Sequence, residues 1–306
     1  MICRREHLGR HPAVFRHMTG LGVEAFDQML PGLLAACGAD RRRRLDRPDR
    51  RRAHGGGGTF DLAPADQVLL TVVWLRQYPT QECLGYLFGV SDSSALRGVR
   101  RCLPVLEAQG KDAMRLPDPG HGRRRRLPAL LRDAPGLAVI VDTFEQRTHR
   151  PKRRPRAYYS GKKKAHTLKS QVAIDEDGKI VDVGVSRPGP WADLKVFRRS
   201  GLAGRLARAG VGALGDLAYV GIDGLVSGLR GAAPRRKPRG RERPAEDRQY
   251  NRAFARRRIK VEHAIGRLRR DQALSAVDRH RRGMHTARVR AVAGLVNRML
   301  DHQKAA

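Results

Sequence analysis

The stretch Leu137-Ala138-Val139-Ile140-Val141-Asp142 decides the fold of the C-terminal half of the chain. A short apolar run rich in β-branched residues is typical of a buried strand, and this one ends in a carboxylate. Residues 211–216 follow the same pattern and end at Asp216. Ligands of open α/β sheets bind beyond the strand ends, so we expect both aspartates to meet in one crevice. The alternative for each aspartate is an ordinary cap or turn residue.

The segments between and after these two strands complete an α/β layer. Residues 168–174 and 179–185 read as a hairpin across Asp177-Gly178, a favoured turn dipeptide. Helices are expected over residues 192–209 and 252–270. Strand, hairpin, helix, strand and helix together predict a mixed sheet with flanking helices, of the ribonuclease H type.

The last of these helices carries a third carboxylate, Glu262, at the border of its buried face. At about 100° per residue, one stripe of the helix is apolar and holds Phe254, Val261, Ile265 and Leu268. An adjacent stripe about 40° wide holds Asn251, Arg258, Glu262 and Arg269. Glu262 can therefore reach into a cleft. Equally, it can form an ordinary ion pair with Arg258, four residues earlier.

Asp142, Asp216 and Glu262 need a chemical explanation because acids are scarce in this chain of 306 residues. It has 63 Lys and Arg against 30 Asp and Glu, a formal net charge of +33. Three convergent carboxylates can hold Mg²⁺ or Mn²⁺, and a pair of such ions cuts and joins phosphodiester bonds. We expect two ions at this site. Arg258 and Arg269 lie beside the glutamate, where they would contact the scissile phosphate.

The basic composition itself favours a nucleic-acid partner, which we expect to be double-stranded DNA. An arginine-rich composition also follows from a GC-rich genome, and the 33 Gly and 17 Pro agree with that alternative. The four cysteines form no CxxC pair, which argues against a zinc site and fits a reducing compartment. The longest strongly apolar stretch, residues 68–75, is too short for a bilayer, and no signal peptide precedes it. We expect a soluble, nucleoid-associated protein of the bacterial cytoplasm with no membrane partner.

A helix-turn-helix is predicted within residues 61–110. Thr80 suits the N-cap of a short helix that stops at Gly89, and Ser91 or Asp92 caps the second helix. Apolar residues of the second helix recur at helical spacing: Leu96, Val99, Leu103 and Leu106. Its outer face would present five polar side chains to DNA: Ser93, Ser94, Arg97, Arg100 and Arg101. A tight αα-hairpin without DNA contacts is the alternative.

Two further basic segments are expected to lie on DNA phosphates. Residues 41–52, followed by four glycines at 55–58, predict a mobile arm, or else a solvated linker. Between Glu145 and Asp175 there is no acidic residue but ten Lys and Arg. Within that stretch, three consecutive lysines would contact the backbone: Lys162, Lys163 and Lys164. A purely solvated loop is the alternative.

Four ordered blocks of sequence resemble transposases of the IS5 type, which carry a DDE-superfamily endonuclease domain behind an N-terminal helix-turn-helix. The first runs from residues 62–67 (LAPADQ) to 87–91 (LFGVS). The second joins Val141-Asp142-Thr143 to residues 159–164 (YSGKKK), and the third is residues 215–221 (GDLAYVG). The fourth is residues 250–263, from YNR to RIKVEH. The resemblance covers residues 17–300 and is more specific than any single block.

The resemblance implies a ribonuclease H-like catalytic domain over residues 136–306, with divalent-metal catalysis. It assigns Asp142, Asp216 and Glu262 to the metal ions, with Arg258 and Arg269 as helpers. The remaining parts would be a helical segment with the basic, glycine-rich arm (1–60), the all-α helix-turn-helix region (61–110) and a linker (111–135). Subunits would assemble as a homo-oligomer on the DNA.

The implied activity is that of a DNA transposase. It would bind the terminal inverted repeats of an insertion element, cleave a strand and transfer it to target DNA. Two alternatives stay open: a host nuclease of the same superfamily that does not transpose, and a DNA-binding repressor with an inactive catalytic domain. Inverted repeats flanking the gene would argue against the first, and metal-dependent nicking against the second.

Overall fold

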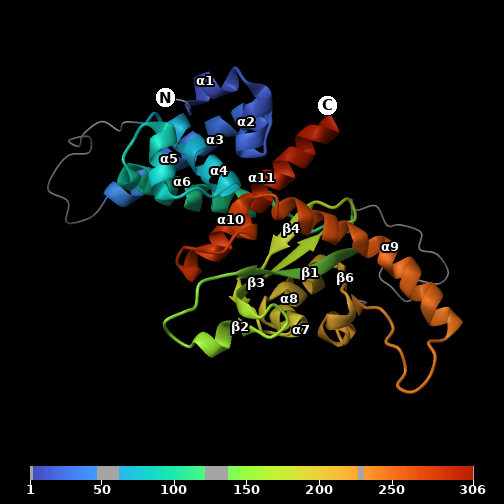
Figure 1. Cartoon of the computed structure of the whole chain (residues 1–306). Coiled ribbons are helices and arrows are strands. Elements are labelled where there is room, and N and C mark those ends of the chain that lie inside the picture. Colours follow the sequence, from blue (N-terminus) through green and yellow to red (C-terminus); the bar gives the residue numbers. More distant parts are fainter. Residues whose placement is uncertain (1–2, 47–61, 121–136, 227–230, 306) are drawn as a thin grey trace. The chain divides into compact units, whose positions relative to one another are not determined.

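The computed structural model describes residues 3–46, 62–120, 137–226 and 231–305. The chain divides into two compact units (Figure 1). The helical unit comprises Met1–Asp112, Arg270–Ala276 and Arg290–Ala306, and the sheet unit comprises Ala113–Arg269 and Val277–Val289. The predicted catalytic segment, 136–306, is thus divided between the two. Arg290–Ala306 belong to the helical unit because the backbones at Gly110 and Gly294 pack directly on each other.

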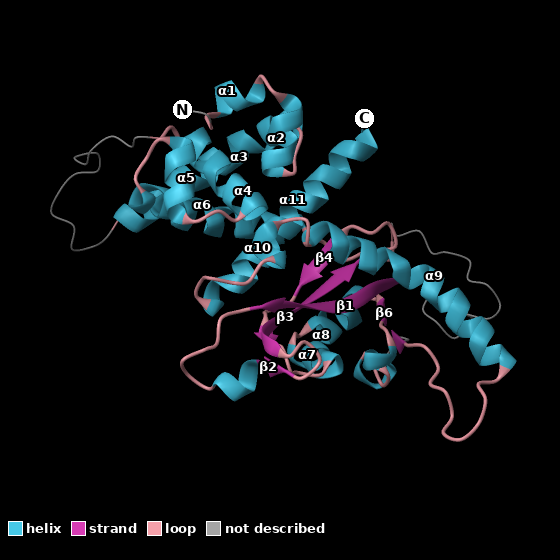
Figure 2. Ribbon diagram, viewed as in Figure 1, coloured by secondary structure: helices cyan, strands magenta, loops and turns pink. Residues whose placement is uncertain are grey.

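The helical unit is built around one central helix that is buried on every side along most of its length, and Figure 2 shows it among the other helices. That helix is α4 (Pro64–Gln77), whose residues 67–75 are all buried. The other helices of the unit are α1 (Arg5–Gly9), α2 (Pro12–Thr19), α3 (Val23–Leu45), α5 (Gln81–Phe88), α6 (Asp92–Ala113), α10 (Gln272–Ser275) and the greater part of α11 (His285–Ala305). Among the described helices, none is both long enough and apolar enough to cross a bilayer.

The predicted caps of the helix-turn-helix are present in α5 and α6. The Thr80 hydroxyl accepts a hydrogen bond from the Cys83 N–H at 3.2 Å, and Gly89 ends α5 with a left-handed φ of 59°. Ser91 accepts from the Ser94 N–H at 3.1 Å at the start of α6. Local hydrogen bonds therefore fix the turn where the sequence predicts it.

The predicted basic arm is wrong at its beginning, because α3 continues to Leu45. Arg43 and Arg44 pair with Asp40 at 2.5 and 2.7 Å, three and four residues away on the helix. Arginine favours helices, and such pairs stabilise them further. The rest of the arm, residues 47–58, lies outside the described residues, as do residues 121–135 of the predicted linker.

The sheet unit contains one mixed seven-stranded sheet with the path β2-β3-β1-β6-β7. β1 is antiparallel to β3 and parallel to β6, β6 is parallel to β7, and β4 and β5 pair with β3. The strands are β1 (Ala138–Arg147), β2 (Tyr159–Ser160), β3 (Ala165–Ile174), β4 (Ile180–Val183), β5 (Arg187–Pro188), β6 (Gly212–Leu214) and β7 (Gly231–Ala232). The predicted β3–β4 hairpin is confirmed, with Gly178 at a φ of 81° in its turn.

Helices cover both faces of this sheet (Figures 1 and 2). α7 (Asp193–Arg199) and α8 (Leu202–Ala209) lie on one face, and α9 (Ala245–Leu268) lies on the other. The core under α7 and α8 joins strand and helix residues such as Val139, Val141, Phe197, Leu202 and Leu206. Short 3₁₀ turns complete the unit: η2 (Pro155–Tyr158), η3 (Leu217–Tyr219), η4 (Asp223–Leu225) and η5 (Arg282–Met284). The single helix expected over residues 192–209 is wrong, because Gly201, at a φ of 69°, separates α7 from α8.

Candidate active site

The register of the sheet brings Asp142 level with Asp216. β1 and β6 run parallel with Ile140 opposite Leu214, and each aspartate follows two residues later, Asp142 within β1 and Asp216 just beyond the end of β6. Contrary to prediction, Asp142 does not end its strand, because β1 continues beside β3 to Arg147. Only β6 ends at this level, so Asp142 lies beside the C-terminal end of β6.

Asp216 is held at this strand end by a tight turn. Its carboxylate accepts a hydrogen bond from the Ala218 N–H at 2.9 Å and so begins η3. A Cβ on Gly215 would lie 2.4 Å from the Tyr219 side chain, so only glycine fits between strand and turn. The packing of Tyr219 thereby determines the direction in which Asp216 leaves the sheet.

Asp142 lies in an electrostatically unusual place. The pKa of Asp142 is raised to about 6, chiefly by burial and to a smaller extent by the carboxylates of Asp216 and Asp193. The Thr143 N–H, which donates to Asp142 Oδ1 at 2.7 Å, and the Arg258 cation act in the opposite direction. Asp142 is thus largely buried, with two further carboxylates and one arginine close enough to affect its ionisation.

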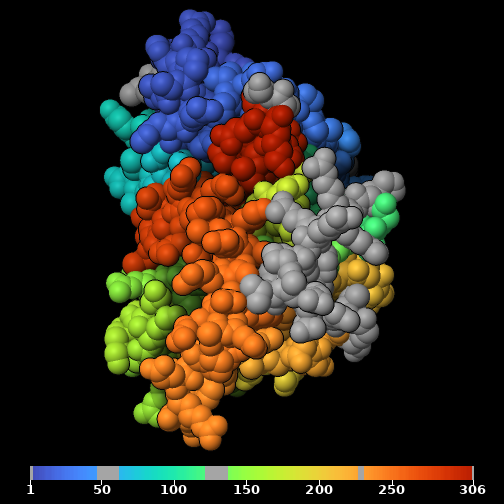
Figure 3. Space-filling model, turned by 90° about the vertical axis from the view of Figure 1, so that its right-hand side faces the viewer, coloured from blue at the N-terminus to red at the C-terminus, as the bar shows by residue number. Residues whose placement is uncertain are grey.

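Arg258 connects Asp142 to Glu262. Its Nη2 atom lies 3.8 Å from Asp142 Oδ2 and 3.9 Å from Glu262 Oε1. The Glu262 side chain is 61% exposed, whereas that of Asp142 is 18% exposed. Figure 3 shows α9, in orange, open to solvent along this face of the molecule. Glu262 therefore makes the i,i+4 pair that its spacing allowed, and it meets Asp142 only through Arg258.

Metal coordination by the three predicted carboxylates is not complete in this arrangement. Among the described residues, no group of three or more His, Cys, Asp or Glu side chains lies close enough to hold a metal ion. Arg269 caps the C-terminal end of α9 and is exposed. It stands two turns, roughly 10 Å along the helix, beyond Glu262.

A buried ionic network that the sequence did not predict lies behind Asp142. Lys169, on β3, is 7% exposed, and its ammonium group donates to Asp193 Oδ1 at 2.7 Å and to the Trp191 carbonyl at 2.6 Å. Thr143, next to Asp142, donates its hydroxyl to the same Asp193 oxygen at 2.7 Å. Glu145 Oε1 lies 3.6 Å from Lys169 Nζ. Asp193 thus joins Thr143 to Lys169 in this network.

Tyr219 adds a second feature that the sequence did not reveal. Its ring is fully buried, and its hydroxyl has no hydrogen-bond partner among the described residues. Burial and the three nearby aspartates raise the pKa of Tyr219. A neutral phenol hydroxyl is therefore available beside the carboxylates.

The predicted DNA-contacting side chains of α6 do not share one environment. Ser93, Arg97 and Arg100 are exposed, and their spacing places them on one face of the helix. Arg101 instead donates to Gln67 Oε1 at 3.1 Å, and burial lowers its pKa. Ser94 is tied to the cap at Ser91. In the sheet unit, the predicted lysines are exposed in the turn between β2 and β3: Lys162, Lys163 and Lys164.

Comparison with known proteins assigns the chain to a family. The family model for the DDE superfamily endonuclease matches residues 141–297, just over half of the chain. The chain belongs to the DDE superfamily of endonucleases. The family model for the helix-turn-helix of DDE superfamily endonucleases matches residues 60–112. The endonuclease match begins next to Asp142 and includes Asp216 and Glu262.

A curated relative of this endonuclease has a related description. The "Probable transposase for insertion sequence element IS702" of Microchaete diplosiphon is 28% identical over 285 residues. The alignment covers 92% of this chain and 93% of that protein. The expected resemblance to DDE transposases with an N-terminal helix-turn-helix is confirmed. The finer assignment to the IS5 type stays a prediction.

Proposed function

We propose that this endonuclease is a DNA transposase that binds the terminal inverted repeats of an insertion element, cleaves a strand there and transfers it to target DNA. The family membership, the helix-turn-helix and the relative described as a probable transposase support this function. At the site, the observation that carries it is the proximity of Asp142, on β1, to Asp216, just after β6, and to Arg258.

The catalytic domain, residues 136–306 in our division, would have a ribonuclease H-like fold. Three antiparallel strands, β4, β3 and β1, followed by the parallel strands β6 and β7 support this assignment. Helices on both faces of the sheet support it as well. Residues 61–110 would read the element end, joined to the catalytic domain by residues 111–135.

Asp142 and Asp216 fit a divalent cation of the Mg²⁺ or Mn²⁺ type. Mg²⁺ commonly takes one or two protein carboxylates and completes its shell with water and substrate phosphate. Burial, together with the carboxylates of Asp216 and Asp193, raises the pKa of Asp142, and a bound cation would stabilise its charged form. Glu262 would become a third ligand only after its side chain leaves Arg258. A second ion would bind at the same stage. Bound here, the cations would activate the attacking oxygen and stabilise the leaving one.

The protein's own groups would position the reacting strand. Arg258, released from Glu262, would bind the scissile phosphate and stabilise its developing charge. Arg269 would contact the flanking backbone from the end of α9. The Thr143 N–H holds Asp142 in place, and Lys169 with Asp193 braces Thr143 from behind.

Exposed polar and basic side chains of both units would hold the DNA. On α6 these are Ser93, Arg97 and Arg100, whereas Arg101 and Ser94 would support the helix from within the unit. In the sheet unit, Lys162, Lys163 and Lys164 would contact phosphates. Subunits would assemble on the paired element ends, in association with the bacterial nucleoid.

A nicking assay tests the proposed function. The substrate is duplex DNA from the regions that flank the gene, incubated with Mg²⁺ or Mn²⁺. Wild type should nick at the element end, Asp142→Asn should lose at least about 100-fold of this rate, and Asp223→Asn, an exposed carboxylate of η4, should not. Equal nicking by wild type and Asp142→Asn would favour a repressor with an inactive domain. Nicking without flanking repeats or strand transfer would favour a host nuclease.

A further inference from the structure

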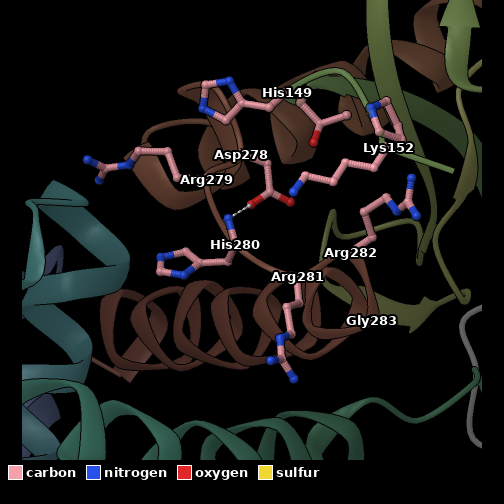
Figure 4. A pocket seen from close by; sticks show the side chains of 10 residues that line it. His149, Lys152, Asp278, Arg279, His280, Arg281, Arg282 and Gly283 are labelled. Atoms are coloured by element: carbon pink, nitrogen blue, oxygen red, sulfur yellow. Dashed lines mark hydrogen bonds between the residues drawn. The ribbon is translucent and has the colours of Figure 1, made fainter. Parts of the chain in front are cut away.

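A basic pocket lies in the sheet unit, apart from the carboxylates. It has a volume of about 420 Å³ and is formed where the loop after β1 meets the loop before η5 (Figure 4). Six nitrogen-bearing side chains line it: His149, Lys152, Arg279, His280, Arg281 and Arg282. Figure 4 shows Lys152 and Arg282 on one side of the pocket and Arg279 on the other.

The floor of the pocket is a fixed structure. Thr148 forms a β-bridge with Asp278, whose N–H donates to the Arg147 carbonyl at 2.8 Å. The Asp278 carboxylate accepts from the His280 N–H at 2.9 Å and from Arg288 Nη2 at 2.5 Å. Asp278 and Arg288 are both fully buried. The acid of the pocket is thus paired with Arg288 beneath it.

Arg282 is held in place but lacks an acceptor. Its guanidinium lies 4.4 Å from the centre of the Tyr158 ring, a cation–π contact. Its Nη1 atom is buried and has no hydrogen-bond partner among the described residues. A buried donor without an acceptor costs free energy, so an anionic oxygen brought by a ligand would be stabilised here. Lys152 is exposed, and Figure 4 shows its side chain extending toward Asp278.

The lining determines the class of ligand. Small-molecule pockets of this size are lined mostly by apolar side chains, whereas four of the ten residues that line this one are Lys or Arg. Arginines and lysines grouped around a fixed floor suit phosphate groups, with arginine binding them through two N–H donors. A polyanion is therefore favoured over an apolar ligand.

The position of the pocket relates it to the proposed reaction. Asp142 and Thr148 are six residues apart, so they lie on the same face along the line of β1. Six residues of strand span roughly 20 Å, and about six base pairs of B-DNA rise by the same length. Resting on the proposed function, we propose that this pocket holds the phosphate backbone of the DNA duplex about six base pairs from the scissile phosphate.

The salt dependence of DNA binding tests this proposal. The full-length chain is titrated with a fluorescent 30-base-pair duplex at several salt concentrations, as wild type and as Lys152→Gln/Arg282→Gln. The control is Arg198→Gln/Arg208→Gln, two exposed arginines of α7 and α8. The slope of log K against log salt should fall by about two in the pocket variant and change little in the control. The exposed Lys152→Glu variant alone should weaken binding in the same direction.

Duplex length provides a second measurement. With DNA from an element end, extension beyond the cut from about four to about ten base pairs should raise the affinity of wild type. The pocket variant should lose this gain, whereas the control should keep it. If the pocket and control variants have equal salt slopes and equal gains in affinity, the inference is overturned. Nicking by wild type would still support the proposed function in that case. Absence of nicking by wild type would instead reject the proposed function itself.

Discussion

Lys169 is a buried cation between two carboxylates, and its removal should be costly. Lys169→Met leaves Asp193 and Glu145 without their cation, which should lower the free energy of unfolding by about 3–5 kcal/mol. Arg205→Met breaks a more exposed pair with Asp182 and should cost only about 0–1 kcal/mol. Urea denaturation of both variants measures the difference. Similar losses would show that the Lys169 network is not the buried brace described above.

His285 should make the fold less stable at acidic pH. Burial, aided by the Arg288 cation, lowers the pKa of His285 from 6.5 to about 4, and the neutral ring bonds to Gln146 and Ser186 at 2.8 Å each. At pH 5 the unfolded chain therefore binds a proton that the folded chain does not. Above pH 6.5, the neutral His285 makes its full contribution to the free energy of unfolding. This contribution, roughly 3 kcal/mol, should be lost as the pH falls towards 4.

Chemical denaturation between pH 7 and pH 4 measures this loss, with His285→Gln as the reference. The variant should be less stable at pH 7, because it does not restore every hydrogen bond of the imidazole. The difference between the two proteins should then shrink as the pH falls, because only wild type loses the contribution of His285. A constant difference would mean that His285 does not titrate on unfolding.

At the scale of single residues, the sequence predicts candidate site residues only where the residues next to them in the chain form a recognisable pattern. An apolar run makes Asp142 a candidate, although a carboxylate after such a run can also be an ordinary cap or turn residue. Lys169 could not be found this way, because lysine is ordinarily exposed and its two partners lie on other elements. Arg101 was placed on the DNA face because helical spacing does not reveal that Gln67, on α4, accepts its hydrogen bond.

At the scale of elements, α6 and α11 cross at two glycines. A Cβ on Gly294 would lie 2.5 Å from the Cα of Gly110, a backbone atom that cannot give way. Gly294→Ala should therefore destabilise the helical unit by about 1–3 kcal/mol. Gly266→Ala, in α9, meets nothing within 4 Å and should stabilise by up to about 1 kcal/mol. Thermal melts of the two variants should move in opposite directions, and a shift of the same sign would refute this packing.

Elements with local signals are predictable, and those made by distant pairing are not. The caps at Thr80 and Ser91 and the turn at Gly178 follow from short-range chemistry. The break at Gly201 was missed because an isolated glycine is tolerated within a helix pattern. Strands β2, β5 and β7 have two residues each and are defined by hydrogen bonds to other strands. They are too short for a hydrophobic periodicity to predict them.

At the scale of the whole molecule, charge should dominate DNA binding. A formal net charge of +33 predicts many phosphate contacts and the release of many counterions. For 6–10 contacts, the affinity of wild type for duplex DNA should fall by about 10³–10⁵ between 50 and 200 mM salt. Fluorescence anisotropy measures this fall. A flat response would show that the basic composition reflects the genome rather than a polyanionic partner.

The central claim is that Asp142 and Asp216, distant in sequence and level across β1 and β6, bind one divalent cation together. Mn²⁺ binding to the full-length chain, followed by electron paramagnetic resonance, tests this claim without any DNA. Changes around a metal ligand already cost about 10–100-fold in affinity, so Asp142→Asn and Asp216→Asn should each weaken Mn²⁺ binding by at least about tenfold. Asp223→Asn should leave it unchanged. Mn²⁺ binding that is unaffected by either of the first two substitutions would contradict the account.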